Sequence, residues 1–247
     1  MTLLHIFAKI DIEVIIMPRF ITAPEVIQLL DEANIKQAVG KIEIAFNGFA
    51  VKLKQRDTVG NSLQEWLYAF LASRDIYFRP NQGQTFPDIY FSEADDEDLC
   101  EMKSFYGSAN FDVANYRSYI NSIAEKPYRL NSDYIIFRYD MNEDGDITIL
   151  DYWCKKVWEI TGPAENYALK CQRKNGQIVN IRPCTWYSDN AKFPAFGSLE
   201  KLLKALYQTQ LSVENNTRVV NEWLQKVLDG YNAYFGTNIT AQDIKNA

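Results

Sequence analysis

Three charged side chains interrupt two stretches of the chain that are otherwise apolar. Asp88 lies within residues 86–91, and Glu101 and Lys103 lie within residues 99–105. Aromatic and aliphatic residues dominate both stretches, and the link between them is acidic and turn-prone, so we expect two adjacent strands. Because alternate residues of a strand share a face, Glu101 and Lys103 would lie about 7 Å apart along the backbone on one face. Packing alone does not call for two opposite charges there.

Two carboxylates with a neighbouring lysine suit the metal-assisted hydrolysis of a phosphodiester. Asp88 and Glu101 offer hard oxygen ligands, and Mg²⁺ usually takes only one or two carboxylates. The backbone carbonyl of Met102 could supply a further ligand. A bound metal lowers the pKa of a water and neutralises charge on the phosphate, while Lys103 would position the water and stabilise the added negative charge. The pattern is loose, and a surface hairpin with a Glu–Lys pair is the alternative.

Glu65 is a provisional third carboxylate for the same site. It falls in a predicted helix, Asn61–Ser73, whose apolar residues recur with helical spacing from Leu63 to Leu71. At 100° per residue, Glu65 lies about opposite the centre of this stripe. It therefore either lines a cleft from the polar side or is solvated.

The elements that would position these residues follow in a regular order. Helix, three strands, helix and strand are predicted in turn, which gives an α/β fold with a mixed central sheet, flanking helices and an αβββαβ core. In chain order the six are Asn61–Ser73, Ile76–Phe78, Phe86–Phe91, Leu99–Phe105, Asn110–Ala124 and Tyr134–Tyr139. The last is a continuous run of strand formers, which is typical of a strand buried on both faces.

Further elements are predicted on either side of this core. Asn47-Gly48 and Asn175-Gly176 are strong hairpin signals. The other predicted elements are a helix at Pro24–Ala33, strands at Ile42–Phe46 and Ala50–Leu53, a strand at Ile147–Trp153, strands at Tyr167–Lys174 and Gln177–Arg182, and closing helices at Ser198–Leu211 and Thr217–Phe235.

Composition is that of an ordinary globular protein and excludes several classes. The chain has 247 residues, of which 47% are hydrophobic and 23% charged, and its formal net charge is −6. It is therefore no polycation that coats nucleic acid, and DNA binding would need a local basic surface. The four cysteines are far apart and there is one histidine, so a zinc site is not expected. We expect the cysteines to be free thiols in a reducing cytoplasm.

The N-terminal stretch predicts neither a signal peptide nor a membrane span. Lys9, Asp11 and Glu13 interrupt the first twenty residues, and no small-residue cleavage site follows. Met17 is a plausible natural start. We therefore expect residues 1–16 to be an N-terminal extension and residues 17–247 to form a single domain.

One region combines basic and aromatic residues in a predicted hairpin and the loop after it. Such residues suit phosphate contacts and the reading of base edges; a solvated hairpin with a packed tryptophan is the alternative. The candidates for DNA contact are Arg173, Lys174, Arg182, Thr185, Trp186, Tyr187 and Lys192, with Lys155 and Lys156 as a weaker second group.

Residues 140–151 match much of the spacing of a calcium-binding loop. Asp140, Asn142, Asp144 and Gly145 fit the pattern, but Asp151 stands where the loop needs a glutamate. Such a loop joins two helices, whereas strands are predicted on both sides here. An ordinary hairpin turn is the favoured interpretation.

Taken together, these stretches resemble the type II restriction endonucleases of the NgoBV/NlaIV group, within the PD-(D/E)xK nuclease superfamily. The resemblance covers about residues 40 to 210. It is carried by Val59–Leu67, Phe86-Pro87-Asp88, Glu101-x-Lys103, Asn110–Asn115, Lys155–Glu159 and Ile181–Tyr187.

The resemblance implies Mg²⁺-dependent cleavage of double-stranded DNA at a short palindrome, expected to be GGNNCC, leaving 5′-phosphates. Asp88, Glu101 and Lys103 match the catalytic positions of the superfamily, and Glu65 matches the helix carboxylate of many members. A homodimer is implied, since each protomer can cut one strand of a palindrome; the terminal helices Ser198–Phe235 are one candidate interface. A cytoplasmic location and protection of host DNA by a cognate methyltransferase are also expected.

Two other functions remain open at this point. A structure-selective repair or recombination nuclease of the same superfamily would carry the same catalytic residues. A non-catalytic module that binds calcium or DNA through residues 140–151 would not need them.

Overall fold

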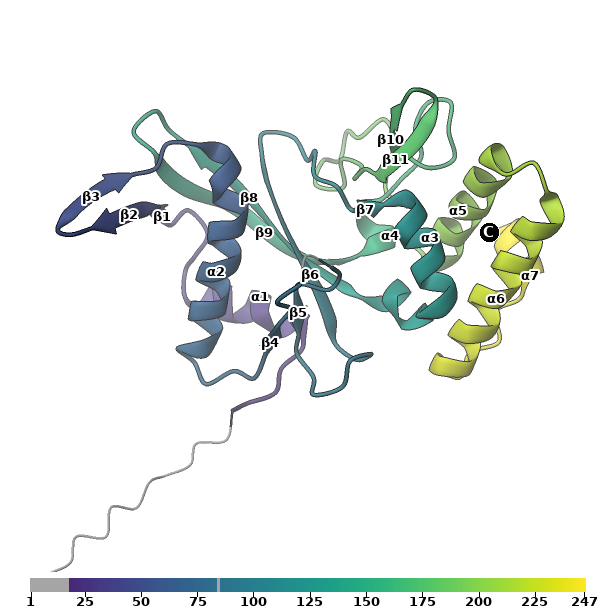
Figure 1. The fold of residues 1–247 in the computed structure, drawn as a ribbon, viewed down its shortest axis with the longest axis horizontal. Helices are drawn as coiled ribbons and strands as arrows, with labels where there is room; N and C mark the ends of the chain where they lie inside the picture. The colour runs from purple at the N-terminus through teal and green to yellow at the C-terminus, as the bar shows by residue number, and fades with distance from the viewer. Residues whose placement is uncertain (1–17, 84) are drawn as a thin grey trace, which may run out of the picture.

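A six-stranded mixed sheet crosses the molecule in the computed structural model, which describes residues 18–83 and 85–247 (Figure 1). Its strand order is β1-β9-β8-β6-β5-β4, and only β6 and β8 run parallel to each other. The strands are β1 (Val39–Lys41), β4 (Arg79–Pro80), β5 (Ile89–Tyr90), β6 (Leu99–Tyr106), β8 (Asp133–Met141) and β9 (Asp146–Lys156). This confirms the predicted mixed α/β sheet with flanking helices.

Side-chain alternation along β8 divides the protein into two hydrophobic clusters. Tyr134 and Ile136 point into one cluster, and Ile135 and Phe137 point into the other. All four side chains are buried. The strand is therefore buried on both faces, as the run of strand formers predicts.

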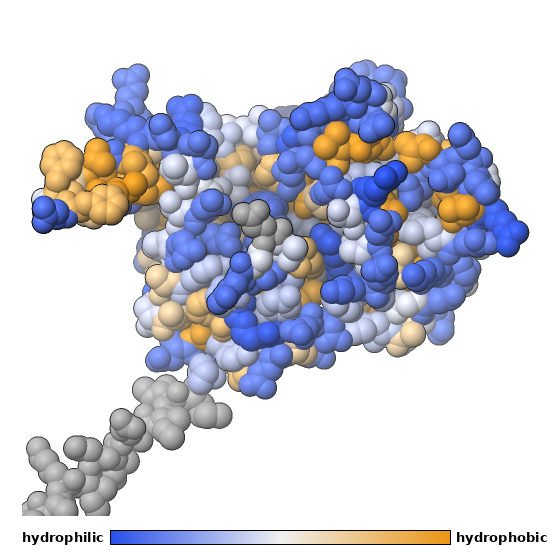
Figure 2. All heavy atoms as spheres, viewed as in Figure 1, coloured by the Kyte–Doolittle hydropathy of each residue, from blue (hydrophilic) through white to orange (hydrophobic). Residues whose placement is uncertain are grey.

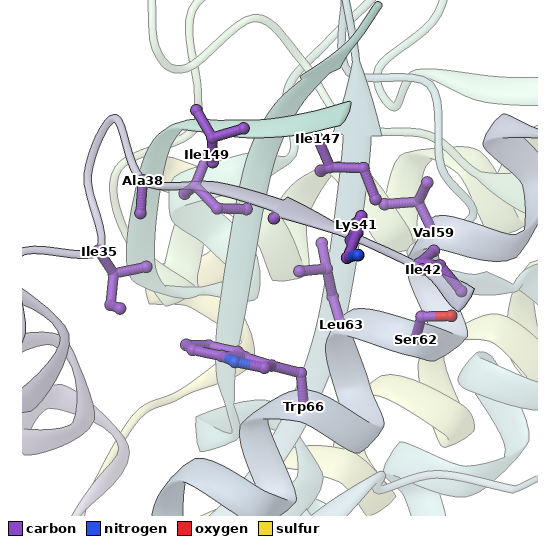
Figure 3. Close-up of a pocket in the computed structure, with 12 residues that line it drawn as sticks. Ile35, Ala38, Lys41, Ile42, Val59, Ser62, Leu63, Trp66, Ile147 and Ile149 are labelled. Atoms are coloured by element: carbon purple, nitrogen blue, oxygen red, sulfur yellow. The ribbon is translucent and has the colours of Figure 1, made fainter. Parts of the chain in front are cut away.

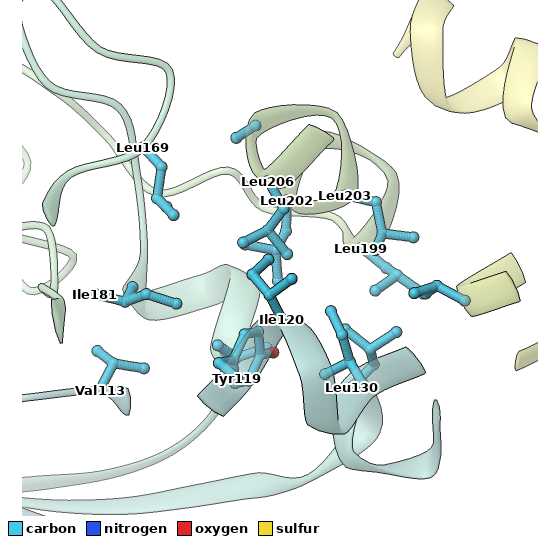
Figure 4. Close-up of a cluster of buried hydrophobic side chains, with 14 of the residues drawn as sticks. Val113, Tyr119, Ile120, Leu130, Leu169, Ile181, Leu199, Leu202, Leu203 and Leu206 are labelled. Atoms are coloured by element: carbon cyan, nitrogen blue, oxygen red, sulfur yellow. The ribbon is translucent and has the colours of Figure 1, made fainter. Parts of the chain in front are cut away.

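Helices from different parts of the chain cover the two faces of the sheet. The first cluster lies under α3 (Tyr116–Glu125), α5 (Leu199–Val213) and α6 (Thr217–Phe235), and Figure 4 shows leucines of α5 meeting Ile120 of α3 there. The second lies under α1 (Ala23–Glu32) and α2 (Val59–Ala72). The remaining helical segments are η1 (Arg56–Thr58), η2 (Pro127–Asn131), α4 (Val157–Ile160) and α7 (Ala241–Asn246).

Two smaller sheets accompany the main one. β2 (Glu43–Phe46) and β3 (Phe49–Lys52) form a hairpin that projects from the body of the molecule (Figure 1). Its turn is Asn47-Gly48, and both residues have positive φ, which is the conformation that Asn-Gly hairpins favour. β10 (Cys171–Lys174), β11 (Gln177–Ile181) and β7 (Ala114–Asn115) form the other sheet.

Several predicted elements differ in their bounds. The strand predicted at Ile76–Phe78 is only an isolated bridge from Ile76 to Arg19, and β4 follows it. The first apolar stretch of the site holds only a two-residue strand, β5. The helix predicted from Asn110 begins at Tyr116, because the preceding residues run extended beside β11 and the Asn115 side chain caps the helix by accepting a hydrogen bond from Ser118 N–H.

Residues 142–145 form the hairpin turn between β8 and β9, and the rest of residues 140–151 belongs to those two strands, so the segment is not a calcium loop. The Asn142 side chain accepts hydrogen bonds from the backbone N–H groups of Asp144 and Asp146, at 3.0 and 2.9 Å. The Asp146 carboxylate is bound by Lys52 at 2.6 Å. The strands on both sides confirm the favoured interpretation of this segment.

The expected extension at residues 1–16 lies outside the described residues. In the part of the chain that is described, no helix has both the length and the apolar character that a membrane crossing requires.

Candidate active site

Asp88 is bound to the backbone of the strand that carries Glu101 and Lys103. β5 pairs Ile89 with Cys100, so Asp88, one residue earlier, stands opposite Glu101. Because β5 begins only at Ile89, it offers no backbone partner to the N–H of Met102. The Asp88 carboxylate accepts that hydrogen bond instead, at 2.7 Å. The N–H and C=O of one residue in a strand point to the same edge. The Met102 carbonyl therefore lies at the edge where Asp88 is held.

Glu101 and Lys103 form a largely buried ion pair. Lys103 Nζ lies 2.7 Å from Glu101 Oε1, as expected for residues two positions apart on one face of β6. Glu101 is only 9% exposed, and its Oε2 has no hydrogen-bond partner among the described residues. Burial raises the pKa of Glu101; Lys103 opposes that rise, and the nearby Asp88 carboxylate adds to it. A buried carboxylate oxygen without a partner is costly in a fold unless it serves a ligand.

Arg129 is a site residue that sequence reasoning missed. It belongs to η2, and its guanidinium carbon lies 4.1 Å from the centre of the Phe86 ring and 5.2 Å from that of Tyr119. Its Nη1 donates to Ser122 Oγ at 2.7 Å. Arg129 also lowers the pKa of Glu101, which places its positive charge near the carboxylates. No motif marks it, because it reaches the site through the packing of α3 and η2.

A cavity of about 520 Å³ lies between the β5–β6 segment and α3. Glu101, Lys103 and Arg129 all line it, whereas Asp88 is not among its lining residues. Asn115 and Ser118, at the start of α3, also line it. Three types of group that bind a phosphodiester, an ammonium, a guanidinium and neutral hydrogen-bonding side chains, therefore meet in one cavity with a carboxylate that could hold a cation.

The residues present fit a divalent cation that is held by few protein ligands. Among the described residues there is no group of three or more His, Cys, Asp or Glu side chains that could hold a metal. Mg²⁺ commonly takes one or two carboxylates and completes its shell with water and substrate phosphate. Asp88 and Glu101 supply two, the second with an oxygen that lacks a partner, and the Met102 carbonyl lies at the same edge.

Glu65 is exposed on α2 and does not line this cavity. Its neighbour Gln64 contacts the site instead. Gln64 Nε2 donates to the Tyr68 hydroxyl at 2.6 Å, and that hydroxyl donates to the backbone carbonyl of Asp88 at 3.0 Å. A catalytic part for Glu65 stays a prediction, whereas Gln64 and Tyr68 hold the backbone of Asp88.

Two of the residues predicted to contact DNA belong to an aromatic cluster. Trp186 and Tyr187 pack on Phe105, at the end of β6, and on Trp153. The Tyr187 hydroxyl accepts a hydrogen bond from the backbone N–H of Ala109 at 3.0 Å. The half-buried Thr185 precedes them. The cluster fixes the loop after β11 to the strand that carries Glu101 and Lys103.

The basic residues predicted to contact DNA differ in how far other residues of the chain already bind their charges. Four form ion pairs: Arg182 with Asp112, Lys192 with Glu165, Lys155 with Glu159 and Lys156 with Asp133. Lys156 also donates to the backbone carbonyl of Asn131 at 2.6 Å, so it is held within the fold. Arg173 stacks on Tyr167, and Lys174 is exposed at the β10–β11 turn. The structure thus gathers the three catalytic candidates in one place but spreads the DNA-contact candidates over several surfaces.

Comparison with known proteins gives consistent matches. The model of the NgoBV restriction endonuclease family matches residues 20–247. The type II restriction enzyme NlaIV of Neisseria lactamica is 36% identical over 218 residues, which are 86% of this chain and 90% of the relative. The type II restriction enzyme NgoBV of Neisseria gonorrhoeae is 34% identical over 158 residues, which are 62% of this chain and 89% of the relative.

A solved structure matches as well. The NlaIV restriction endonuclease superposes with a TM-score of 0.84 at 36% identity, covering 90% of this chain and 93% of that one. The family model spans the helices, the central sheet and the cavity, so the likeness is not confined to the segments that carry the candidate catalytic residues. The chain therefore belongs to the NgoBV restriction endonuclease family and is a type II restriction endonuclease of the NlaIV/NgoBV type.

Proposed function

We propose that this protein hydrolyses double-stranded DNA at a short palindromic site with the help of Mg²⁺ and leaves 5′-phosphates. GGNNCC is the proposed site, because the group that the sequence resembles is associated with it. The support for the chemistry is the family, together with a cavity in which carboxylate, ammonium and guanidinium groups meet.

One observation carries the catalytic assignment: the buried Glu101 Oε2, without a partner among the described residues, lies beside a lysine and near a second carboxylate. Without a hydrogen-bond or metal partner, such a buried oxygen carries a desolvation cost. A cation that contacts it would satisfy it. The same arrangement explains why Lys103 binds the other oxygen, Oε1, and leaves Oε2 free.

Each residue then has a part that follows from its position. Asp88 and Glu101 would hold Mg²⁺, together with the Met102 carbonyl. When bound, the metal lowers the pKa of a water and neutralises charge that develops on the phosphate. Lys103 would orient the attacking water and stabilise added negative charge. Arg129, set between two rings, would bind a phosphate oxygen with its planar donors.

Recognition of DNA would involve the β10–β11 hairpin and the loop after it. Lys174 is exposed at the turn, and the loop is joined to β6 through Phe105, Trp186 and Tyr187. Such a connection would keep base-reading groups at a fixed distance from Glu101 and Lys103. Lys155, Arg182 and Lys192 would have to exchange their acidic partners for phosphates.

The proposed function carries several further expectations. A palindromic target favours a homodimer, in which each protomer cuts one strand. We propose that residues 17–247 act as a single unit in the cytoplasm, and that a cognate methyltransferase protects host DNA without being bound to this protein.

Incubation of plasmid DNA with the purified protein tests the proposal. A discrete set of fragments is expected with Mg²⁺ and none with EDTA. Nicking confined to branched DNA, with linear duplex left intact, would assign the cavity to structure-selective repair instead. No cleavage under any divalent cation would refute the proposed activity.

A further inference from the structure

The β2–β3 hairpin presents an apolar face that nothing in the described chain covers. The ladder pairs Ile44 with Val51 and Phe46 with Phe49. Cross-strand partners share a face, so these four side chains form one face, which we call the hairpin ridge. All four are exposed, and the two phenylalanines are each 76% exposed. Figure 2 shows apolar residues gathered on this projecting arm.

The exposed side chains of this ridge bury little apolar surface within the described chain, so they do little to stabilise its fold. A two-stranded hairpin is marginally stable by itself in water. Contiguous apolar side chains on a surface mark an interaction site. On the other face, the pair Ala45 and Ala50 and the ion-paired Lys52 are what a solvated surface requires.

An open apolar pocket lies at the base of the same hairpin (Figure 3). Leu63 and Trp66 of α2 line it together with Ile147 and Ile149 of β9. Its volume is about 220 Å³. An apolar cavity of about 150 Å³ holds a benzene molecule, so one phenylalanine ring fits.

The ridge and the pocket form one continuous surface. Ile42 lines the pocket, and its carbonyl accepts a hydrogen bond from Leu53 N–H at 2.8 Å, which extends the hairpin ladder by one pair. Ile42 and Ile44 are two positions apart, so both side chains lie on one face. An occupant that covers the ridge would therefore also reach the pocket.

We propose that the ridge docks on a second copy of this chain, with the aromatic tip of each hairpin in the pocket of the other. The inference deepens the proposed function, because a palindromic target calls for a two-fold dimer. In a two-fold pair, one surface must complement itself. Each hairpin has its aromatic tip at one end and the pocket at its base, about 14 Å apart for four-residue strands. When two hairpins lie antiparallel, each tip meets the pocket of the other, so the surface complements itself.

The charges favour a protein partner over DNA. Residues 44–51 carry no charge, and at the base Lys41 and Lys52 are bound to Glu43 and Asp146. Side chains that wedge into DNA work beside cations that contact the phosphates. An uncharged tip suits instead the described lining of the pocket, in which Lys41 is the one charged residue and its charge is paired with Glu43.

The described chain begins beside the end of α2 that lies away from the pocket, so residues before it would have to run back along that helix to cover the pocket. Arg19 bridges Ile76, just beyond the C-terminal end of α2. The pocket lies against the first two turns of α2, near Val59 and Leu63. A helix of 14 residues separates the two places by about 21 Å.

Sedimentation of the full chain, without DNA or metal, tests the interface independently of cleavage. We expect wild type to be a dimer at micromolar concentration, and Phe46→Asp/Phe49→Asp to be a monomer with an unchanged circular dichroism spectrum. Both positions are exposed, so the fold does not depend on them. The matched control is Val219→Asp on the exposed surface of α6, which we expect to stay dimeric.

A cross-link separates the proposed exchange from other contacts. Phe49→Cys/Ser62→Cys is expected to form a disulfide-linked dimer on oxidation, because Ser62 lines the pocket and only a partner's tip would reach it. Neither single variant should cross-link to the same extent. A wild-type monomer, a dimer broken by Val219→Asp instead, or a tip variant that stays dimeric and loses only DNA affinity would each overturn the proposal.

Discussion

The Asp88 carboxylate accepts a hydrogen bond from the backbone N–H of Met102 at 2.7 Å. This contact joins the two segments that carry the candidate catalytic residues, and it depends on the shortness of β5, which leaves that N–H without a strand partner. The hydrogen bond also decides which substitution of Asp88 tests the site. An asparagine at position 88 keeps an oxygen that accepts the bond but loses the negative charge.

Asp88→Asn should therefore abolish cleavage without unfolding the protein. We expect a loss of at least about 100-fold in single-turnover rate, the scale of removing one electrostatic group from an active site. The melting temperature should stay within a few degrees of wild type. Asp88→Ala is the matched comparison, since it also removes the hydrogen bond and should lower stability by about 1 kcal/mol. Equal rates for wild type and Asp88→Asn would refute the assignment.

Glu101→Gln separates activity from stability. Burial raises the pKa of Glu101 above its value in the unfolded chain, so the ionised form destabilises the fold. That penalty is present above the raised pKa and disappears as the pH falls below the unfolded value. We expect the variant to lose cleavage and to melt no lower than wild type at pH 8, with any gain vanishing toward pH 4. A variant that melts well below wild type at pH 8 would contradict this account.

Arg129→Gln should lower the cleavage rate and shift its pH profile. Arg129 lowers the pKa of Glu101, so its removal raises that pKa and moves the acid limb of the profile to higher pH. We expect a loss of about 100-fold in rate. Arg129→Lys keeps the charge without the planar donors and should preserve the acid limb but not the full rate. An unchanged profile in Arg129→Gln would place Arg129 outside the site.

Lys156→Met should reduce stability and leave DNA binding unchanged. Lys156 pairs with the largely buried Asp133 at 2.9 Å, and its loss leaves that carboxylate without its ion-pair partner. Breaking a fully buried pair costs about 3–5 kcal/mol; this pair is partly exposed, and we expect about 2 kcal/mol in urea unfolding.

The matched control for that variant is Lys174→Met at the exposed β10–β11 turn. It should leave stability unchanged and reduce the salt dependence of DNA affinity by about one phosphate contact. If Lys156→Met instead reduced the salt dependence of DNA affinity and Lys174→Met did not, Lys156 would be a phosphate contact.

Much of the fold could be predicted from the sequence because its signals are local. Alternation placed Glu101 and Lys103 on one face of β6, and Asn47-Gly48 marked the β2–β3 turn. The helix predicted from Asn110 was too long because the pairing of Ala114 with Ile181 in β11 is a tertiary contact. No local periodicity reports such a contact.

The site could be predicted only where a motif marks it. Asp88, Glu101 and Lys103 carry the pattern, whereas Arg129 reaches the cavity through the packing of η2 against α3. Lys156 shows a second limit: the sequence marks it as basic but does not show that it pairs with Asp133. The sequence reports which charges are present but not which charges neutralise one another in the fold.

The most direct test of the central claim is to sequence the ends of DNA cut by wild type and by Asp88→Asn in the presence of Mg²⁺. We expect every wild-type end to carry a 5′-phosphate and to fall in one palindromic sequence, with no ends above background for Asp88→Asn. Ends scattered without a shared sequence, or identical end maps for the two proteins, would contradict a sequence-specific endonuclease centred on Asp88.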